Sequence, residues 1–316
     1  MDINNTLSLY KAAHYYYIEH LSQQEIASKM NISRPQISRM LKKAQETGIV
    51  KIQVNFPNFL SAEQISTKIE NYFQHTCRII LTPFSEEAQK NDEALYINAA
   101  KHLKFFLENA HNIGIGWGQT LYNISLHLSN HVDSKKRCFI AVSGTSGTCN
   151  PYFQTNNIVD RFAASYGANA FYNNFSSLID TSMLSAFEQK RLHTLQNKWN
   201  TLDTLIIGLG SVEKAKEHYS EEFFDTNFFD YVSKEMEGEI LGNFFSEQKI
   251  YHFEDTRCIS SLSLEHLLNI KTTICIAHGS SKVSPLILAL KKGYINTLIT
   301  DYNTGKLILE KLEKET

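Results

Sequence analysis

The apolar residues at the start of the chain recur at helical spacing. In residues 7–19, Leu9, Ala12, Ala13 and Tyr16 fall on one side, which predicts a first helix with that side buried. Two further short stretches show the same spacing, and each follows a serine that is placed to cap a helix. The pattern therefore predicts three helices at the N-terminal end of the chain.

Capping boxes mark the expected starts of the second and third helices. Ser22 is followed three residues later by Glu25, and Ser33 is followed by Gln36, so each pair can satisfy N–H groups in a first turn. Asn31 lies between the two helices, and asparagine tolerates the left-handed backbone of a tight turn. Two helices joined in this way predict a helix-turn-helix.

The third predicted helix has an apolar side and an opposite, basic side. Ile37, Leu41 and Ala44 share the side that is expected to be buried. The residues expected to contact DNA begin this helix or lie on its other side: Ser33, Arg34, Pro35, Gln36, Ser38, Arg39, Lys42 and Lys43. Gln36 suits the edge of adenine and Arg39 that of guanine, whereas the other basic and hydroxyl side chains suit phosphates.

The pattern changes after Gly48. Residues 49–54 alternate between apolar and polar, which predicts a strand or wing. Residues 55–61 break the periodicity and contain Pro57, which predicts a linker. We therefore expect a DNA-binding domain over residues 1–55 and an effector-binding and oligomerisation domain over residues 56–316.

Short apolar runs then alternate with helical stretches. Strands are expected at 77–81, 113–117, 138–142, 169–173, 204–210, 273–278 and 296–300. Helices are expected at 61–74, 87–109, 118–129, 154–166, 182–199, 263–268, 282–292 and 303–313. This alternation predicts an α/β domain with a mostly parallel sheet, larger than the all-α domain before it.

Segments rich in glycine and hydroxyl groups follow three of these strands. They cover residues 114–120, 143–148 and 278–282, at the ends of strands where open parallel sheets bind ligands. Glycines let the backbone approach an anion, and hydroxyl, N–H and lysine groups bind it. The expected effector-binding residues are Gly116, Trp117, Gly118, Ser143, Gly144, Thr145, Glu239, His278, Gly279 and Lys282.

Several of these residues also have a structural interpretation. Trp117 suits stacking on a sugar or a place in the core, and His278 suits a ligand contact or polar packing. Glu239 suits binding of sugar hydroxyls, whereas Asp301 more simply caps the last helix. The glycine segments match neither the dinucleotide nor the Walker pattern, so no nucleotide cofactor is expected.

The composition indicates how charge is distributed along the chain and where in the cell the protein is expected. Residues 1–55 carry a net charge of +3 and the remainder −5, which fits DNA contact by the first domain. The cysteines are odd in number and widely spaced: Cys77, Cys138, Cys149, Cys258 and Cys275. They predict neither disulfides nor a zinc site, and the histidines show no metal-binding spacing. Without a signal peptide or a long apolar run, a cytoplasmic protein without membrane contact is expected.

The same segments resemble the SorC family of sugar-responsive bacterial regulators. The resemblance rests on residues 21–54, on GIGWGQTL, LIIGLGSV, EGEILGNFF and AHGSSK, and above all on KKGYINTLITDYNTGKLIL. It implies a fold like that of glucosamine-phosphate deaminase and ribose-phosphate isomerase. It also implies a homodimer or homotetramer on a palindromic operator in double-stranded DNA, controlled by a small phosphorylated sugar.

These observations predict a transcriptional regulator of carbohydrate or nucleoside catabolism genes rather than an enzyme. One alternative is a sugar-phosphate isomerase or deaminase with an appended DNA-binding domain, because fold does not fix function. Another is a helix-turn-helix that contacts only protein. Affinity for DNA that falls with salt would distinguish the regulator from this last alternative.

Overall fold

The computed structural model describes residues 3–51, 60–82, 88–131, 135–145, 150–214, 226–253 and 256–315. It divides the chain into two compact units, Met1–Phe59 and Leu60–Thr316. Each unit has its own hydrophobic core and is described by itself. No helix in the described ranges combines the length and the apolarity that a membrane crossing requires.

The first unit contains the three predicted helices, α1 (Ile3–Tyr17), α2 (Gln23–Met30) and α3 (Arg34–Glu46). Ser22 accepts a hydrogen bond from the Glu25 N–H at 3.3 Å, and Glu25 accepts one from the Ser22 N–H at 2.8 Å. Asn31 ends α2 with φ 55°, in the left-handed conformation that its side chain tolerates. The cap and the turn therefore lie where the sequence predicts them.

One side of each helix forms the core of this unit, with α1 contributing Leu9, Ala12 and Ala13. Tyr16 was expected on the same side, and that expectation is wrong, because its side chain is exposed. Tyr15 and Tyr17 pack against the core instead. Residues 49–51 form no strand, and the rest of the predicted strand or wing lies outside the described residues.

The second unit is built on a seven-stranded sheet in the order β1-β12-β11-β6-β2-β3-β4. Its strands are β1 (Arg78–Leu81), β2 (Asn112–Ile115), β3 (Cys138–Ala141), β4 (Asn169–Phe171), β6 (Thr204–Ile207), β11 (Thr272–Ile276) and β12 (Thr297–Thr300). All neighbours in this sheet pair in parallel. The predicted fold class and the seven predicted strands are confirmed.

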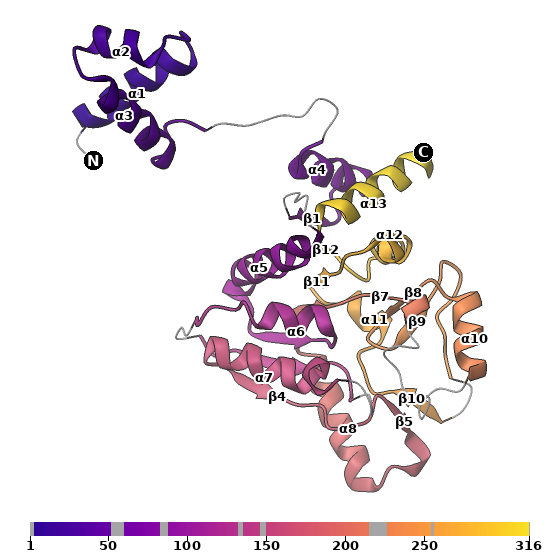
Figure 1. Cartoon of the computed structure of the whole chain (residues 1–316). Coiled ribbons are helices and arrows are strands. Elements are labelled where there is room, and N and C mark those ends of the chain that lie inside the picture. The colour runs from indigo at the N-terminus through magenta and orange to yellow at the C-terminus, as the bar shows by residue number, and fades with distance from the viewer. Residues whose placement is uncertain are drawn as a thin grey trace. The chain divides into compact units, whose positions relative to one another are not determined.

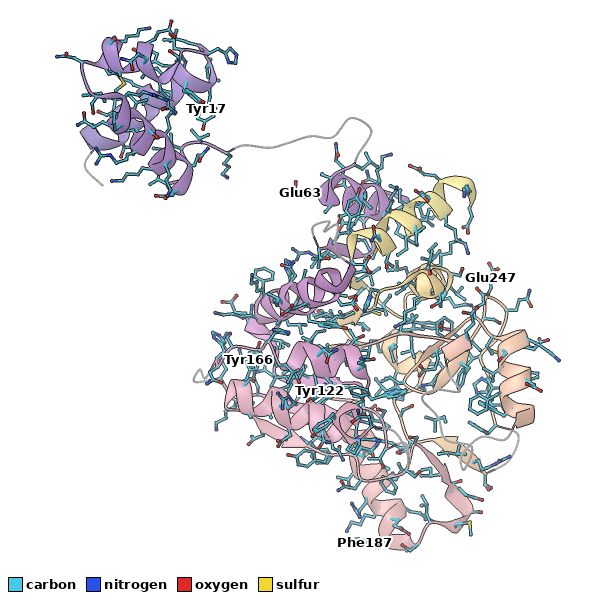
Figure 2. All side chains as sticks on the ribbon, in the orientation of Figure 1. Tyr17, Glu63, Tyr122, Tyr166, Phe187 and Glu247 are labelled. Carbon is cyan, nitrogen blue, oxygen red and sulfur yellow. The ribbon has the colours of Figure 1, made fainter. Side chains whose placement is uncertain are left out.

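Helices cover both faces of this sheet (Figure 1). One face carries α4 (Ala62–Tyr72), α8 (Ala186–Trp199), α11 (Leu264–Leu267), α12 (Val283–Lys291) and α13 (Tyr302–Glu315). The other carries α5 (Ala88–Phe106), α6 (Gln119–Ser125) and α7 (Thr155–Tyr166). Tyr166 of α7 packs its ring 5.5 Å from that of Phe139 on this second face (Figure 2). Successive strand residues point to opposite cores, so most of the strand residues are apolar.

Several short elements were not predicted. They are β5 (Leu178–Asp180), β7 (Gly210–Ser211), β8 (Gly238–Ile240), β9 (Asn243–Phe245), β10 (Arg257–Ile259), α10 (Thr226–Glu235) and the 3-10 helices η2 (Pro151–Phe153) and η4 (Val212–Lys214). Three further 3-10 helices, η1 (Leu107–Asn109), η3 (Thr181–Met183) and η5 (Ser280–Lys282), overlap the helices predicted at 87–109, 182–199 and 282–292. The strands form two small antiparallel sheets, β10-β5 and β7-β8-β9. Strands of two or three residues carry too little periodicity to be recognised.

Candidate functional site

The outer side of α3 is exposed along its whole length. The predicted DNA-contacting residues are all on it or at its start, and all are exposed: Ser33, Arg34, Pro35, Gln36, Ser38, Arg39, Lys42 and Lys43. Ile37, Leu41 and Ala44 are buried on the opposite side, so their packing fixes which side faces outward. The amphipathic period thus gives α3 a polar, basic surface.

Hydrogen bonds already orient two of these side chains. The Gln36 Oε1 atom accepts hydrogen bonds from the Ser33 N–H at 2.9 Å and the Ser33 hydroxyl at 2.8 Å. The Arg39 Nε–H donates to the Pro35 carbonyl at 3.3 Å. Gln36 therefore holds the start of α3, and a bidentate contact with adenine would compete with this capping bond.

An open, polar concave surface lies at the turn between α2 and α3. It is lined by Gln24, Ala27, Ser28, Asn31, Ile32, Ser33, Arg34 and Gln36. Gln24 and Ser28 belong to α2 and were not among the predicted DNA contacts. Their position one helical turn apart on α2 was a signal available in the sequence, because the first helix of this motif crosses the phosphate backbone.

The sheet of the second unit has a switch point between β2 and β6. From β2 the chain continues to β3 and β4 on one side, and from β6 it continues to β11 and β12 on the other. Ligands bind beyond the carboxyl ends of strands at such a point. Gly116, Trp117 and Gly118 follow β2 there, and Gly208, which was not predicted, follows β6.

A small, partly enclosed pocket lies beside the loop that follows β2. Its lining residues are Trp117, Ser143, Gly144, Gln154, Ser177, Leu241, Gly242 and Ile259. Three of them were predicted, and the others come from segments that meet only in the folded chain. The empty volume of this pocket is about 280 Å³, and it includes open solvent at the mouth of the pocket.

The segment after β3 is largely satisfied by the protein itself. The Ser143 and Thr155 hydroxyls are 2.6 Å apart and buried, and the Gly144 N–H donates to the Ser260 carbonyl at 2.8 Å. A Cβ on Gly144 would lie 2.6 Å from the Ser176 carbonyl oxygen. Thr145 does not line the pocket, and its N–H donates to the Phe175 carbonyl. Close backbone packing therefore accounts for Gly144.

Glu239 is buried on β8 and orients the turn that follows it. One carboxylate oxygen accepts a hydrogen bond from the Gly242 N–H, and the other lies against Gly210 on β7, where a Cβ would be 2.6 Å away. Leu241 and Gly242 have φ values of 55° and 84°. The carboxylate thus stabilises a turn whose residues line the pocket.

The loop after β11 carries His278, Gly279 and Lys282. Gly279 has φ 109°, a conformation that L residues rarely adopt, and its N–H donates to the Thr304 hydroxyl at 2.8 Å. Within the described ranges, no heavy atom outside the adjacent residues lies within 4 Å of where a Cβ of Gly279 would be. Lys282 is half-buried and lies at the end of η5, directly before α12.

Two carboxylates flank His278. Its Nδ1 atom lies 3.4 Å from Asp92 Oδ1 and 3.6 Å from Asp301 Oδ2. The ring of Tyr96 packs edge-on at 6.3 Å. Burial raises the pKa of the Tyr96 phenol, and the Asp92 carboxylate raises it further, whereas a hydrogen bond with Asn123 lowers it. Asp301 caps α13, because its Oδ1 atom accepts a hydrogen bond from the Thr304 N–H at 2.6 Å.

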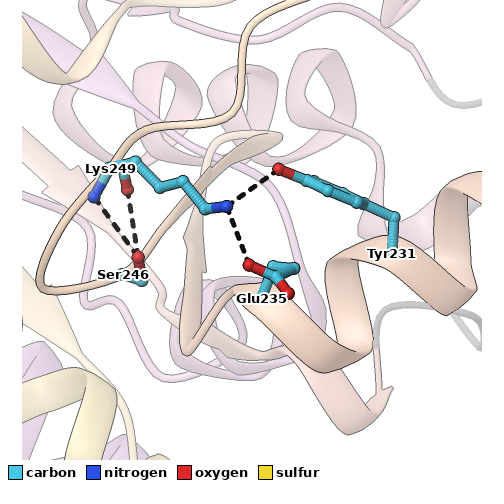
Figure 3. Close-up of polar contacts among 4 residues, drawn as sticks. All are labelled: Tyr231, Glu235, Ser246 and Lys249. Atoms are coloured by element: carbon cyan, nitrogen blue, oxygen red, sulfur yellow. Dashed lines mark hydrogen bonds and ion pairs between the residues drawn. The ribbon is translucent and has the colours of Figure 1, made fainter.

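A mostly aromatic cluster, here called the α10 wall, packs beside Trp117. It contains Phe229 and Val232 of α10 and Phe244 of β9, and the half-buried Trp117 side chain packs against them. Lys249 joins α10 to the turn after β9. Its ammonium donates to Glu235 at 2.8 Å and to the Tyr231 hydroxyl at 3.0 Å (Figure 3).

The contacts among Lys249, Glu235 and Tyr231, here called the Lys249 clamp, also shift pKa values. The hydrogen bonds to Glu235 and Tyr231 raise the pKa of Lys249, and the bond from Lys249 lowers the pKa of Glu235. Both groups are largely exposed, so the ion pair adds little to stability. Lys249 is thus committed to a structural contact at the outer side of α10.

The predicted effector residues therefore gather into two groups at one edge of the sheet. Trp117, Ser143 and Gly144 line the pocket, with Glu239 supporting it. His278, Gly279 and Lys282 lie two strands away, after β11. Gly116 is buried beneath Leu241, and Gly118 begins α6 with φ 117°.

Comparisons with known proteins agree with this architecture. Residues 58–310 match the family described as "Putative sugar-binding domain", and residues 19–51 match one described as "Winged helix-turn-helix DNA-binding". The chain is 25% identical to the sorbitol operon regulator of Klebsiella pneumoniae over 310 residues, covering 95% of this chain and 96% of that protein. It is 26% identical to the transcriptional regulator LsrR of Escherichia coli K12 over 315 residues, covering 95% and 93%.

Solved structures show the same fold. The full-length sorbitol operon regulator SorC of K. pneumoniae superposes with a TM-score of 0.71 at 23% identity, over 97% of this chain and 99% of that one. A transcriptional regulator from Streptococcus pneumoniae gives 0.69 at 24% identity, over 79% and 98%.

The fold and the sequence matches define a DNA-binding transcriptional regulator that senses a sugar. The helix-turn-helix precedes an effector domain that spans most of the chain. The chain belongs to the family of sugar-binding domains and, with its helix-turn-helix, to the SorC family of regulators.

Proposed function

We propose that a small phosphorylated sugar binds at the carboxyl edge of the seven-stranded sheet and controls the affinity of the chain for its operator. The observation that carries this proposal is the conformation of Gly118 and Gly279, which follow β2 and β11 on either side of β6. At both positions the described residues leave open space where a side chain would be, so an anion can approach the backbone.

Lys282 supplies the positive charge at this edge, and His278 supplies a polar ring. Trp117 and Glu239 suit the sugar, through its apolar faces and its hydroxyl groups respectively. We expect no direct donation to the ligand from Gly116, Ser143, Gly144 or Thr145, because their own contacts are internal.

We further propose that residues 1–55 bind double-stranded DNA and residues 56–316 bind the effector and a second copy of the chain. A homodimer or homotetramer would present two copies of α3 to the half-sites of a palindromic operator. Arg39 would bind a guanine edge, and Arg34, Lys42 and Lys43 would bind phosphates. The genes controlled would be those of carbohydrate or nucleoside catabolism.

A panel of sugar phosphates and their unphosphorylated sugars tests the effector in a thermal-unfolding assay. A ligand present at 100 times its dissociation constant should stabilise the folded chain by about 2.7 kcal/mol. Lys282→Ala should abolish this shift, and Lys190→Ala, which removes an exposed charge on α8, should preserve it. An undiminished shift in the Lys282→Ala chain would reject the phosphate assignment.

DNA binding is tested by fluorescence anisotropy with an operator fragment at several salt concentrations. Phosphate contacts make the affinity fall with salt, and Arg39→Ala should cost about 1–3 kcal/mol if the guanidinium reads a base. Lys11→Ala removes an exposed charge from α1 and serves as the matched control. Equal losses in the two variants would contradict the assignment of α3 as the recognition helix.

The arrangement of His278 between Asp92 and Asp301 favours one alternative, a sugar-phosphate isomerase or deaminase. A histidine paired with a carboxylate can move a proton to or from a substrate. Turnover of the same sugar phosphates, followed by mass spectrometry, distinguishes the two functions. An activity that His278→Ala removes while operator binding persists would support an enzyme.

A further inference from the structure

The loop after β11 is tied to the first turn of α13 by side-chain hydrogen bonds. The Gly279 N–H donates to the Thr304 hydroxyl at 2.8 Å, and that hydroxyl donates to Asp301 Oδ2 at 3.0 Å. Asp301 also lies 3.6 Å from the His278 ring. A change in the backbone at His278 or Gly279 must therefore break these bonds or move the start of α13.

The same turn of α13 holds the chain where it enters the second unit. The Tyr302 hydroxyl donates to the Leu60 carbonyl at 2.8 Å. Leu60 is the first described residue after residues 52–59, which lead from the helix-turn-helix, and it directly precedes Ser61, the N-cap of α4. Tyr302 thus contacts the residue at which the second unit begins, directly after the segment that links it in sequence to the helix-turn-helix.

Packing makes this turn a rigid piece. Tyr302 is 4% exposed and Thr304 is 1% exposed, so both hydroxyls act inside the protein. Gly305 approaches β1 so closely that a Cβ would lie 2.5 Å from Leu81 Cδ2. Closely packed interiors shift between discrete arrangements rather than deform gradually, so residues 301–305 are expected to move together.

We propose that residues 301–305 connect the effector site to the DNA-binding unit. Contact of the effector with His278 and Gly279 changes the bond between Gly279 and Thr304, the first turn of α13 shifts, and Tyr302 carries that shift to Leu60 and the start of α4. This connection rests on the proposed function, because it requires an effector at the loop after β11. It assigns to Thr304 and Tyr302 a role in coupling, with contact to neither ligand.

The test uses the full chain and an operator fragment selected in vitro, with sorbitol 6-phosphate, fructose 6-phosphate and deoxyribose 5-phosphate as probes. The quantity measured is the ratio of operator affinities with and without saturating probe. Ordinary allosteric coupling changes an affinity about 5- to 150-fold. Thr304→Val and Tyr302→Phe should each bring this ratio to within about twofold of unity, whereas the affinity for the probe in the absence of DNA should change less.

Two matched controls separate coupling from general damage. Thr304→Ser keeps the hydroxyl and should keep the ratio. Lys68→Gln breaks the exposed 3.1 Å ion pair with Glu313, which also joins α4 to α13 but lies outside the proposed connection, and should keep the ratio as well. Hydrogen exchange gives a second readout, because probe binding should change the exchange of residues 61–66 in the wild-type chain and not in Thr304→Val.

The outcomes are distinct. Wild-type coupling that both Thr304→Val and Tyr302→Phe retain overturns the connection and leaves the proposed function standing. A wild-type chain that binds neither operator nor any sugar phosphate overturns the proposed function, and the connection with it. Loss of coupling in Lys68→Gln to the same extent as in Tyr302→Phe also overturns the connection, because any loosening of α13 on α4 would then suffice.

Discussion

Two loops at the edge of the sheet have the same backbone and different surroundings. Gly118 after β2 and Gly279 after β11 have φ values of 117° and 109° and ψ values of 162° and 148°, and each directly precedes a helix. The Gly118 N–H donates to the Phe153 carbonyl, whereas the Gly279 N–H donates to the Thr304 side chain. The two glycines thus share a backbone conformation, but the N–H of one is bound by a backbone carbonyl and that of the other by a side chain.

The difference lies in what holds each loop. Trp117 fixes the first loop by packing between two hydrophobic clusters, and it lines the pocket. His278 fixes the second loop by polar contacts with Asp92 and Asp301. Apolar packing suits a loop that stays in place, because the stabilisation from buried apolar surface is large and does not depend on direction. Polar contacts between a few atoms can be exchanged for contacts with a ligand, which suits a loop that responds.

The largest expected effect separates the two loops by stability. Trp117→Ala should cost about 3 kcal/mol, the low end for large-to-small core changes, because the ring is half-buried. His278→Ala should cost about 1 kcal/mol, since of its two partners Asp92 is largely exposed and only Asp301 is mostly buried. Urea unfolding of both variants measures the change in the free energy of unfolding. Equal costs would show that the two loops are held in the same way.

A smaller effect should be shared by the two loops. Gly118→Ala and Gly279→Ala each force a side chain into a backbone region that L residues avoid, which costs about 1–3 kcal/mol. Gly208→Ala is the matched control at the same edge of the sheet, because its nearest neighbours lie at 3.9 and 4.0 Å from an added Cβ and it needs no positive φ. Unfolding of the three variants checks the shared strain. A cost at Gly208 as large as at Gly118 would contradict it.

The smallest effect concerns the Lys249 clamp, which holds the α10 wall beside Trp117. Lys249→Met removes the contacts with Glu235 and Tyr231, and it should leave the melting temperature nearly unchanged, since these groups are exposed. Hydrogen exchange of residues 228–235 should become faster, because α10 loses its outer contact. Lys234→Met removes a charge from the same helix and should leave the exchange unchanged. A loss of stability close to that of Trp117→Ala would show that the Lys249 clamp is part of the core.

Local patterns predicted the elements that are large enough to carry a period. The serine caps and Asn31 defined the helix-turn-helix, and the apolar runs defined the seven strands of the main sheet. The misplacement of Tyr16 shows the limit of the method, since three adjacent tyrosines offer similar choices for one helix face. The short strands around β8 escaped prediction because pairing with distant segments, rather than propensity, holds them.

The candidate effector residues also divide into those that a local pattern predicted and those that only the folded chain brings together. Glycine-rich segments after β2, β3 and β11 were visible in the sequence, but the segment after β3 proved to be occupied by internal contacts. Gln154, Ser177 and Gly242 line the pocket with Trp117, and no common motif marks them. They meet only in the folded chain, because Gln154 directly precedes α7, Ser177 directly precedes β5 and Gly242 lies between β8 and β9.

The sequence by itself determined the three helices of the first unit, the exposed basic side of α3 and the order along the chain of the seven strands of the parallel sheet, because caps, periodicity and strand alternation are local properties. Only the tertiary structure decided which glycine loop is held by apolar packing and which by polar contacts. Thr304 meets Gly279 from 25 residues away, and Tyr302 meets Leu60 from 242 residues away. Such hydrogen bonds depend on the register of packed elements, and no local pattern of residues contains that register.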